Sequence, residues 1–93
     1  MIKSFKCKKT EKVYIRKTVK AFPENILVRA RRKLLMINAS SSVKDLEIPP
    51  ANRLEKLTGD REGAYSIRIN DQWRICFYFK NGDAFDVEIV DYH

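Results

Sequence analysis

The chain has 93 residues, of which 44% are hydrophobic and 11% aromatic, and its 19 Lys and Arg against 12 Asp and Glu give a formal net charge of +7. This length and composition predict one folded domain over residues 1–93 and exclude a disordered chain. The excess of positive charge favours a polyanionic partner such as nucleic acid, the ribosomal surface or an acidic protein.

The polar start of the chain and the lack of a long apolar run argue against a signal peptide and a membrane-spanning helix. We therefore expect a cytoplasmic protein with no membrane partner. The single histidine and two cysteines are too few for a standard zinc site, so we expect no metal and no other cofactor. Cys76 is interpreted as a packing thiol rather than a nucleophile.

The first half of the chain predicts a short edge strand at residues 2–5, a surface helix at residues 8–19 and a clearer helix from Pro23 to Asn38. Pro is well tolerated in a first helical turn. Apolar residues then recur at helical spacing, at Ile26, Leu27, Ala30, Leu34 and Ile37. A serine-rich run ends this helix, and residues 43–52 form a connector in which Leu46 and Ile48 are expected to contact the core.

The last third of the chain alternates apolar and polar residues through three runs, which predicts an antiparallel meander. One face carries Tyr65, Ile67, Ile69, Trp73, Ile75, Phe77, Phe79, Phe85, Val87 and Ile89. Aligning this face requires three-residue loops at 70–72 and 81–83, which pair Ile67 with Ile75 and Phe79 with Phe85. Helices followed by a sheet predict an α+β fold, with the helices covering this apolar face.

Two arginines lie opposite each other on the second face of the sheet in this register. Arg68 faces Arg74, and like charges across a ladder destabilise a sheet by a few tenths to about 1 kcal/mol. One explanation is that an anion binds between them, since a guanidinium group matches phosphate oxygens. The alternative is that each arginine extends into water or pairs with Glu55 or Glu88. The sequence leaves both explanations open.

If helices cover the first face, the second face is expected to be open, and it offers Ser66, Arg68, Arg74, Tyr78, Glu88 and Tyr92. Metal-free RNA cleavage requires a protein to accept the 2′-hydroxyl proton, stabilise phosphate charge and protonate the leaving oxygen. The arginines suit the phosphate, Tyr92 suits a base or a hydrogen bond, and the terminal His93 suits proton transfer. Strict alternation places His93 on the helix-covered side unless the strand ends at Tyr92.

Several motifs resemble a known family: Gly59-Asp60-Arg61, residues 69–75 (INDQWRI) and Asp91-Tyr92-His93, with MIKSFK and PPANRLEKL also fitting. They are similar to the HigB toxins of bacterial host-inhibition toxin–antitoxin systems in the RelE superfamily. The resemblance implies a compact RelE-like fold, with an N-terminal strand and two helices on one face of an antiparallel sheet. It also implies ribosome-dependent endoribonuclease activity on translated mRNA in the ribosomal A site.

The resemblance also implies roles for individual residues. Arg74 is similar to the family's phosphate-stabilising arginine, and Asp91, Tyr92 and His93 are similar to its C-terminal active-site residues. The expected RNA-binding residues are Lys56, Arg61, Arg68 and Tyr78. Some relatives have a histidine and a lysine where this sequence has Glu55 and Thr58, and Lys56 is the nearest lysine. The implied partners are mRNA, the ribosome and a HigA-type helix-turn-helix antitoxin.

A second hypothesis is a non-catalytic module that binds RNA or an antitoxin, for which arginine substitutions weaken affinity without changing any rate. A DNA repressor is a third and weaker hypothesis, because the best predicted helix is followed by a serine-rich loop and strands rather than by a recognition helix.

Overall fold

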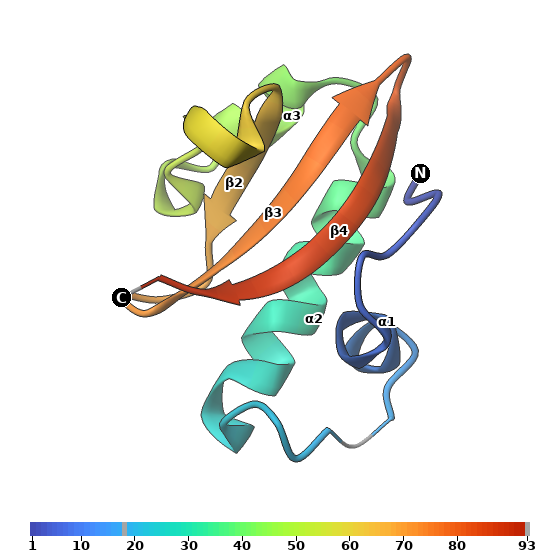
Figure 1. Ribbon diagram of the computed structural model, residues 1–93, viewed down its shortest axis with the longest axis vertical. Helices are drawn as coiled ribbons and strands as arrows, with labels where there is room; N and C mark the ends of the chain where they lie inside the picture. Colours follow the sequence, from blue (N-terminus) through green and yellow to red (C-terminus); the bar gives the residue numbers. More distant parts are fainter. Residues whose placement is uncertain (18, 93) are drawn as a thin grey trace.

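The computed structural model describes residues 1–17 and 19–92 and packs helices on one face of a four-stranded antiparallel sheet of order β1-β2-β3-β4 (Figure 1). The elements are α1 (Lys8–Tyr14), α2 (Glu24–Ala39), α3 (Val43–Glu47), β1 (Glu55–Lys56), β2 (Ala64–Arg68), β3 (Trp73–Lys80) and β4 (Asp83–Asp91), with 3₁₀ turns at Pro50–Asn52 and Gly59–Arg61. The predicted α+β class is confirmed.

The main core lies between α2 and the first face of the sheet. The sequence predicts Pro23 in the first turn of this helix, but in the structure Pro23 is the N-cap and α2 begins one residue later, at Glu24. The buried residues of α2 are Ile26, Ala30, Leu34 and Ile37, and they belong to one cluster with Ile67, Ile75, Phe77 and Val87 of the strands. Within the described residues, no helix combines the length and apolar character needed to cross a membrane.

The predicted first helix is shorter in the structure, because α1 ends at Tyr14 instead of continuing to Val19. Arg16 adopts a left-handed φ of 68°, and its amide donates to the Val13 carbonyl at 3.2 Å, which closes the last turn. The described residues between α1 and α2 form turns and no further helix or strand.

The N-terminal residues lie parallel to β4 (Figure 1). They form two isolated bridges, from Ile2 to Ala84 and from Phe5 to Val87, rather than the regular strand predicted for residues 2–5. The amide of residue Lys3 donates to the Ala84 carbonyl at 2.7 Å. This segment therefore covers the outer edge of β4, which protects an otherwise unpaired strand.

The predicted register between β2 and β3 is confirmed. The Ile69 amide donates to the Trp73 carbonyl at 2.8 Å, and the turn is supported by the Asn70 side chain, which accepts from the amides of Gln72 and Trp73. The paired residues are Tyr65 with Phe77, Ile67 with Ile75 and Arg68 with Arg74.

The predicted turn between β3 and β4 is wrong. Lys80 pairs with Asp83, so the loop has two residues, and Phe79 faces Ala84 instead of Phe85. Both loop residues, Asn81 and Gly82, have positive φ (53° and 83°), as a type I′ hairpin turn requires.

A bulge in β4 corrects the shift that this short turn introduces. Asp86 and Val87 together stand opposite Phe77, and Asp86 has a left-handed φ of 51°. The predicted pairing therefore holds beyond the bulge, where Ile75 faces Ile89.

The connector contains more structure than predicted. A capping box of Ser42 and Asp45 starts α3, and Leu46 is fully buried as expected. Ile48 is 77% exposed, so the expectation that it packs on the core is wrong. β1 was also not predicted, because a two-residue strand is too short to show alternation.

Candidate functional site

The second face of the sheet is not open, which corrects the prediction. Ser66, Arg74 and Cys76 on this face are all buried, and Arg74 is only 7% exposed. Leu57 packs on it in a second small cluster with Ala64 and Cys76. The cover comes from the chain between Arg53 and Gly63, which returns along β2 as β1 and the 3₁₀ turn.

The guanidinium group of Arg74 donates three hydrogen bonds to other residues of the chain. Its Nε donates to the Ser66 hydroxyl at 2.8 Å, and its Nη2 donates to the Arg53 carbonyl at 2.5 Å and the Ser66 carbonyl at 3.2 Å. Arg53 has a left-handed φ of 43°, which follows the 3₁₀ turn and starts the return toward β2. These bonds fix the plane of the guanidinium group, because three of its five N–H donors are engaged.

The remaining edge of Arg74 faces two groups that a ligand can replace or share. Its Nη1 lies 3.8 Å from a carboxylate oxygen of Glu55, which is 55% exposed. An ion pair this exposed contributes little stability, so a phosphate can compete for the same donor. The Tyr92 ring lies against the guanidinium group, with its centroid 5.7 Å from Cζ.

Arg68 is not part of this site. Its backbone is opposite Arg74 as predicted, but its guanidinium group pairs with Asp71 three residues along the chain. Its charge also acts on Lys33 of α2, whose pKa is lowered first by burial and then by Arg29, Arg32 and Arg68. The two arginines therefore diverge, and the repulsion between them needs no anion from outside.

Arg61 approaches the same face from the 3₁₀ turn after β1. Its Nη1 donates to Glu88 at 2.6 Å, and this hydrogen bond raises the pKa of the guanidinium group. Lys6 lies 3.8 Å from the same carboxylate oxygen of Glu88. Burial raises the pKa of the Cys76 thiol, the positive charges of Arg61 and Arg74 oppose that shift, and the carboxylate of Glu88 adds to it.

The end of β4 separates two of the predicted catalytic residues. Asp91 is opposite Trp73, on the helix side, and the Gln72 side chain donates to its carboxylate at 3.2 Å. Tyr92 is held by its amide, which donates to the Gln72 carbonyl at 2.6 Å, and its ring lies on the Arg74 side. The predicted role of His93 lies outside the described residues.

The two other predicted RNA-binding residues are placed differently. Tyr78 is 38% exposed on the second face, beside Gly63 and opposite Ala64. Lys56 pairs with Tyr65, whose ring stacks on Phe77 of the core, so it is exposed on the opposite side of the sheet from Arg74. Lys56 is therefore not brought to the site.

From the sequence, Glu55 is a possible partner for an arginine and a position where some relatives have a histidine, but neither Glu55 nor Lys6 is assigned a site role. Glu55 reaches the site because β1 pairs it with Ser66, next to Arg74. Lys6 reaches it because the N-terminal segment runs beside β4. The sequence feature that could have indicated the role of Glu55 is its position shortly after Pro49-Pro50, where the chain turns back toward β2.

The arrangement is suited to a phosphodiester. Arg74 and Arg61 supply fixed positive charge, Tyr92 supplies an aromatic ring and a hydroxyl, and Glu55 supplies an accessible carboxylate as a proton acceptor. In the described part of the chain, no group of three or more His, Cys, Asp or Glu residues is positioned to hold a metal ion.

Sequence comparison identifies the family. Residues 3–93 match the family model for the HigB-like toxin, described as the RelE-like toxin of the type II toxin–antitoxin system HigB. The chain belongs to this family. It is 36% identical over 93 residues, and over the full length of both chains, to the Endoribonuclease HigB of Proteus vulgaris. It is also 42% identical over 62 residues to Toxin HigB-1 of Vibrio cholerae, covering 67% of this HigB-like chain and 65% of the relative.

Solved structures support the RelE-like fold of this HigB-like toxin. YafQ from E. coli aligns over 98% of this chain and 91% of its own, with a TM-score of 0.61 and 14% identity. A heterotetrameric YoeB–YefM toxin–antitoxin complex from Staphylococcus aureus aligns over 100% of this chain and 98% of that chain, with a TM-score of 0.62 and 16% identity. At these identities the likeness concerns the fold, which agrees with the predicted helices on one face of an antiparallel sheet.

Proposed function

We propose that this endoribonuclease toxin cleaves translated mRNA in the ribosomal A site, by metal-free attack of a ribose 2′-hydroxyl on the adjacent phosphate. The observation that carries the proposal is the arrangement around Arg74. Its guanidinium plane is fixed by Ser66 and the Arg53 carbonyl, while its Nη1 lies 3.8 Å from the exposed carboxylate of Glu55. A fixed donor aimed at an accessible position is what stabilisation of a phosphorane requires.

The site residues then divide the reaction between them. Arg74 and Arg61 bind the scissile phosphate, and Tyr92 stacks on a base or donates a hydrogen bond. Glu55 accepts the 2′-hydroxyl proton as the bond from that oxygen to phosphorus forms. His93 protonates the 5′-oxygen as its bond to phosphorus breaks, which leaves a 2′,3′-cyclic phosphate. Asp91 supports the end of β4 through Gln72.

The ribosome has a defined part in this proposal. The site lies on a sheet face that is mostly filled by the chain's own side chains, so it offers one edge of Arg74 rather than a deep cleft for a nucleotide. If a ribosome holds the mRNA strand in place, the toxin needs only this edge of Arg74 to contact the scissile phosphate. The same proposal includes action in the cytoplasm, as one domain over residues 1–93, and control by a HigA-type helix-turn-helix antitoxin.

Cleavage assays with and without ribosomes test the function. Purified toxin is incubated with an mRNA, alone or on stalled ribosomes, and new 5′ ends are mapped by primer extension. We expect ends within codons only when ribosomes are present. Equal cleavage of free mRNA contradicts ribosome dependence. Absence of cleavage both with and without ribosomes contradicts the proposed mRNA cleavage.

The role of Glu55 is tested in the same assay. Glu55→Gln keeps the size of the side chain but removes its ability to accept a proton, so we expect the cleavage rate to fall about 100-fold. Glu62→Gln is the matched control, since Glu62 is an exposed residue outside the site. Equal rates for the two variants assign the proton transfer to another group.

A further inference from the structure

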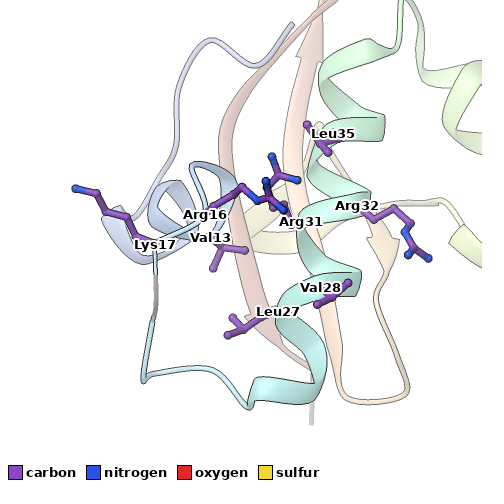
Figure 2. Close-up of a pocket in the computed structure, with 8 residues that line it drawn as sticks. All are labelled: Val13, Arg16, Lys17, Leu27, Val28, Arg31, Arg32 and Leu35. Atoms are coloured by element: carbon purple, nitrogen blue, oxygen red, sulfur yellow. The ribbon is translucent and has the colours of Figure 1, made fainter.

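A groove between α1 and α2 lies outside the site used in the proposed reaction. It encloses about 390 Å³ and is lined by Val13, Arg16, Lys17, Leu27, Val28, Arg31, Arg32 and Leu35. Figure 2 shows this helix groove, with aliphatic side chains from both helices, Arg16 and Arg31 between the helices, and Lys17 and Arg32 directed outward from its two sides. It shares no residue with the site around Arg74.

The α2 side of the helix groove has a regular pattern. Val28, Arg31, Arg32 and Leu35 stand at the i, i+3, i+4 and i+7 positions of one helix face, with apolar residues at the ends and two arginines between them. This face is separate from the buried stripe of α2. Val28 is 71% exposed and Leu35 is 40% exposed, so both residues present apolar surface to solvent.

The cations of the helix groove have no acidic partner among the described residues. None of the ion pairs among the described residues involves Arg16, Lys17, Arg31 or Arg32. Arg31 Nε is the one buried side-chain nitrogen or oxygen without a hydrogen-bond partner in residues 1–17 and 19–92. Figure 2 shows Arg16 and Arg31 extending toward each other between the helices. Two facing guanidinium groups without an acceptor favour an anionic group from another molecule.

We propose that the helix groove binds an acidic amphipathic helix of the antitoxin. An amphipathic helix presents apolar residues seven apart with acidic residues between them, which complements the Val28-Arg31-Arg32-Leu35 face in both chemistry and spacing. RNA is the less favoured occupant, because the apolar lining is aliphatic and carries no aromatic ring on which a base can stack. This inference rests on the proposed pairing with an antitoxin.

The test measures binding and cleavage in parallel. The antitoxin encoded beside the gene for this chain is purified and titrated into the toxin by calorimetry. Arg31→Ala combined with Arg32→Ala removes two groove cations, and Val28→Ser removes an exposed apolar contact without touching the core. Lys8→Ala combined with Lys9→Ala is the charge-matched control, since both lysines are exposed on α1 outside the groove.

We expect the double arginine variant to raise the Kd for the antitoxin about tenfold or more, Val28→Ser to raise it several-fold, and the lysine control to leave it unchanged. Cleavage of ribosome-bound mRNA is expected to stay at the wild-type rate in all three variants. A fluorescent single-stranded RNA is titrated as the second probe, and its affinity is expected to change equally in the two charge-matched variants.

Two results overturn the inference in distinguishable ways. If wild-type toxin binds the antitoxin and the groove variants bind it equally well, the groove is not the antitoxin site although the proposed partnership holds. If wild-type toxin does not bind the antitoxin, the partnership fails and the groove assignment fails with it. Loss of RNA affinity in the arginine variant alone, with antitoxin affinity retained, assigns the helix groove to RNA.

Discussion

Arg74 illustrates how one residue serves both the fold and the proposed reaction. Its bonds to Ser66 and the Arg53 carbonyl tie the strand to the returning segment, and the same bonds fix the direction of the edge that meets a phosphate. A buried charge is costly unless hydrogen bonds compensate it, and the segment that covers the second face supplies one of these hydrogen bonds through the Arg53 carbonyl.

For the arginines of β2 and β3, the sequence predicts the backbone pairing but not the partners of the guanidinium groups. Arg68 and Arg74 are opposite, as alternation and the turn at residues 70–72 require. Their guanidinium groups then follow the nearest acceptors, which are Asp71 for one and Ser66 for the other. A long side chain has several rotatable bonds, so its backbone position leaves its terminal group free to choose among acceptors that only the folded chain defines.

The two cysteines provide a test of burial at the residue scale. Cys76 is 2% exposed and burial raises the pKa of its thiol, whereas Cys7 is partly exposed at the start of α1. Because the thiolate is the reactive form, we expect Cys7 to react with a disulfide reagent at least about ten times faster than Cys76. Stopped-flow labelling of Cys7→Ser and Cys76→Ser variants measures each rate separately. Comparable rates contradict the packing of the second face.

At the scale of elements, the turn and bulge in β4 act together. The Asn81-Gly82 turn alone would place the apolar residues of β4 on the wrong face, and the extra residue at Asp86 returns Val87 and Ile89 to the core. Alternation in the sequence revealed the second half of β4 correctly. It did not reveal the bulge, since a three-residue turn and a two-residue turn with a bulge give the same pattern at Ile89.

Substitutions at Asp86 test the bulge. Valine is strained at a φ of 51°, so we expect Asp86→Val to lower the free energy of unfolding by about 1–2 kcal/mol. Glycine adopts this conformation freely, so Asp86→Gly should lie within about 0.5 kcal/mol of the wild type. Urea denaturation gives both values. A valine variant as stable as the glycine variant would show that residue 86 is not left-handed.

At the scale of the whole molecule, charge is divided between two regions. The site on the second face carries Arg61 and Arg74. The helix groove carries four cations that form no ion pair among residues 1–17 and 19–92, while the net charge of the chain is +7. This division explains why composition indicated a polyanionic partner but not its class. A phosphate chain and an acidic protein are both compatible with the same total charge.

Salt dependence is the corresponding prediction. Binding to ribosomes through phosphate contacts releases counterions, so raising KCl from 50 to 200 mM should weaken the affinity of the toxin for ribosomes by about tenfold or more. Fluorescence anisotropy of labelled toxin across a salt series measures the slope. An affinity that is independent of salt would mean that the basic surface does not contact RNA.

The central claim is that Arg74, and not its neighbour Arg68, holds the scissile phosphate. Cleavage rates of Arg74→Ala and Arg68→Ala on ribosome-bound mRNA test it most directly, at a temperature where circular dichroism shows both variants folded. We expect Arg74→Ala to lower the rate about 100-fold or more and Arg68→Ala to lower it only a few-fold, since Arg68 is paired with Asp71. Equal losses, or a larger loss for Arg68→Ala, would contradict the assignment.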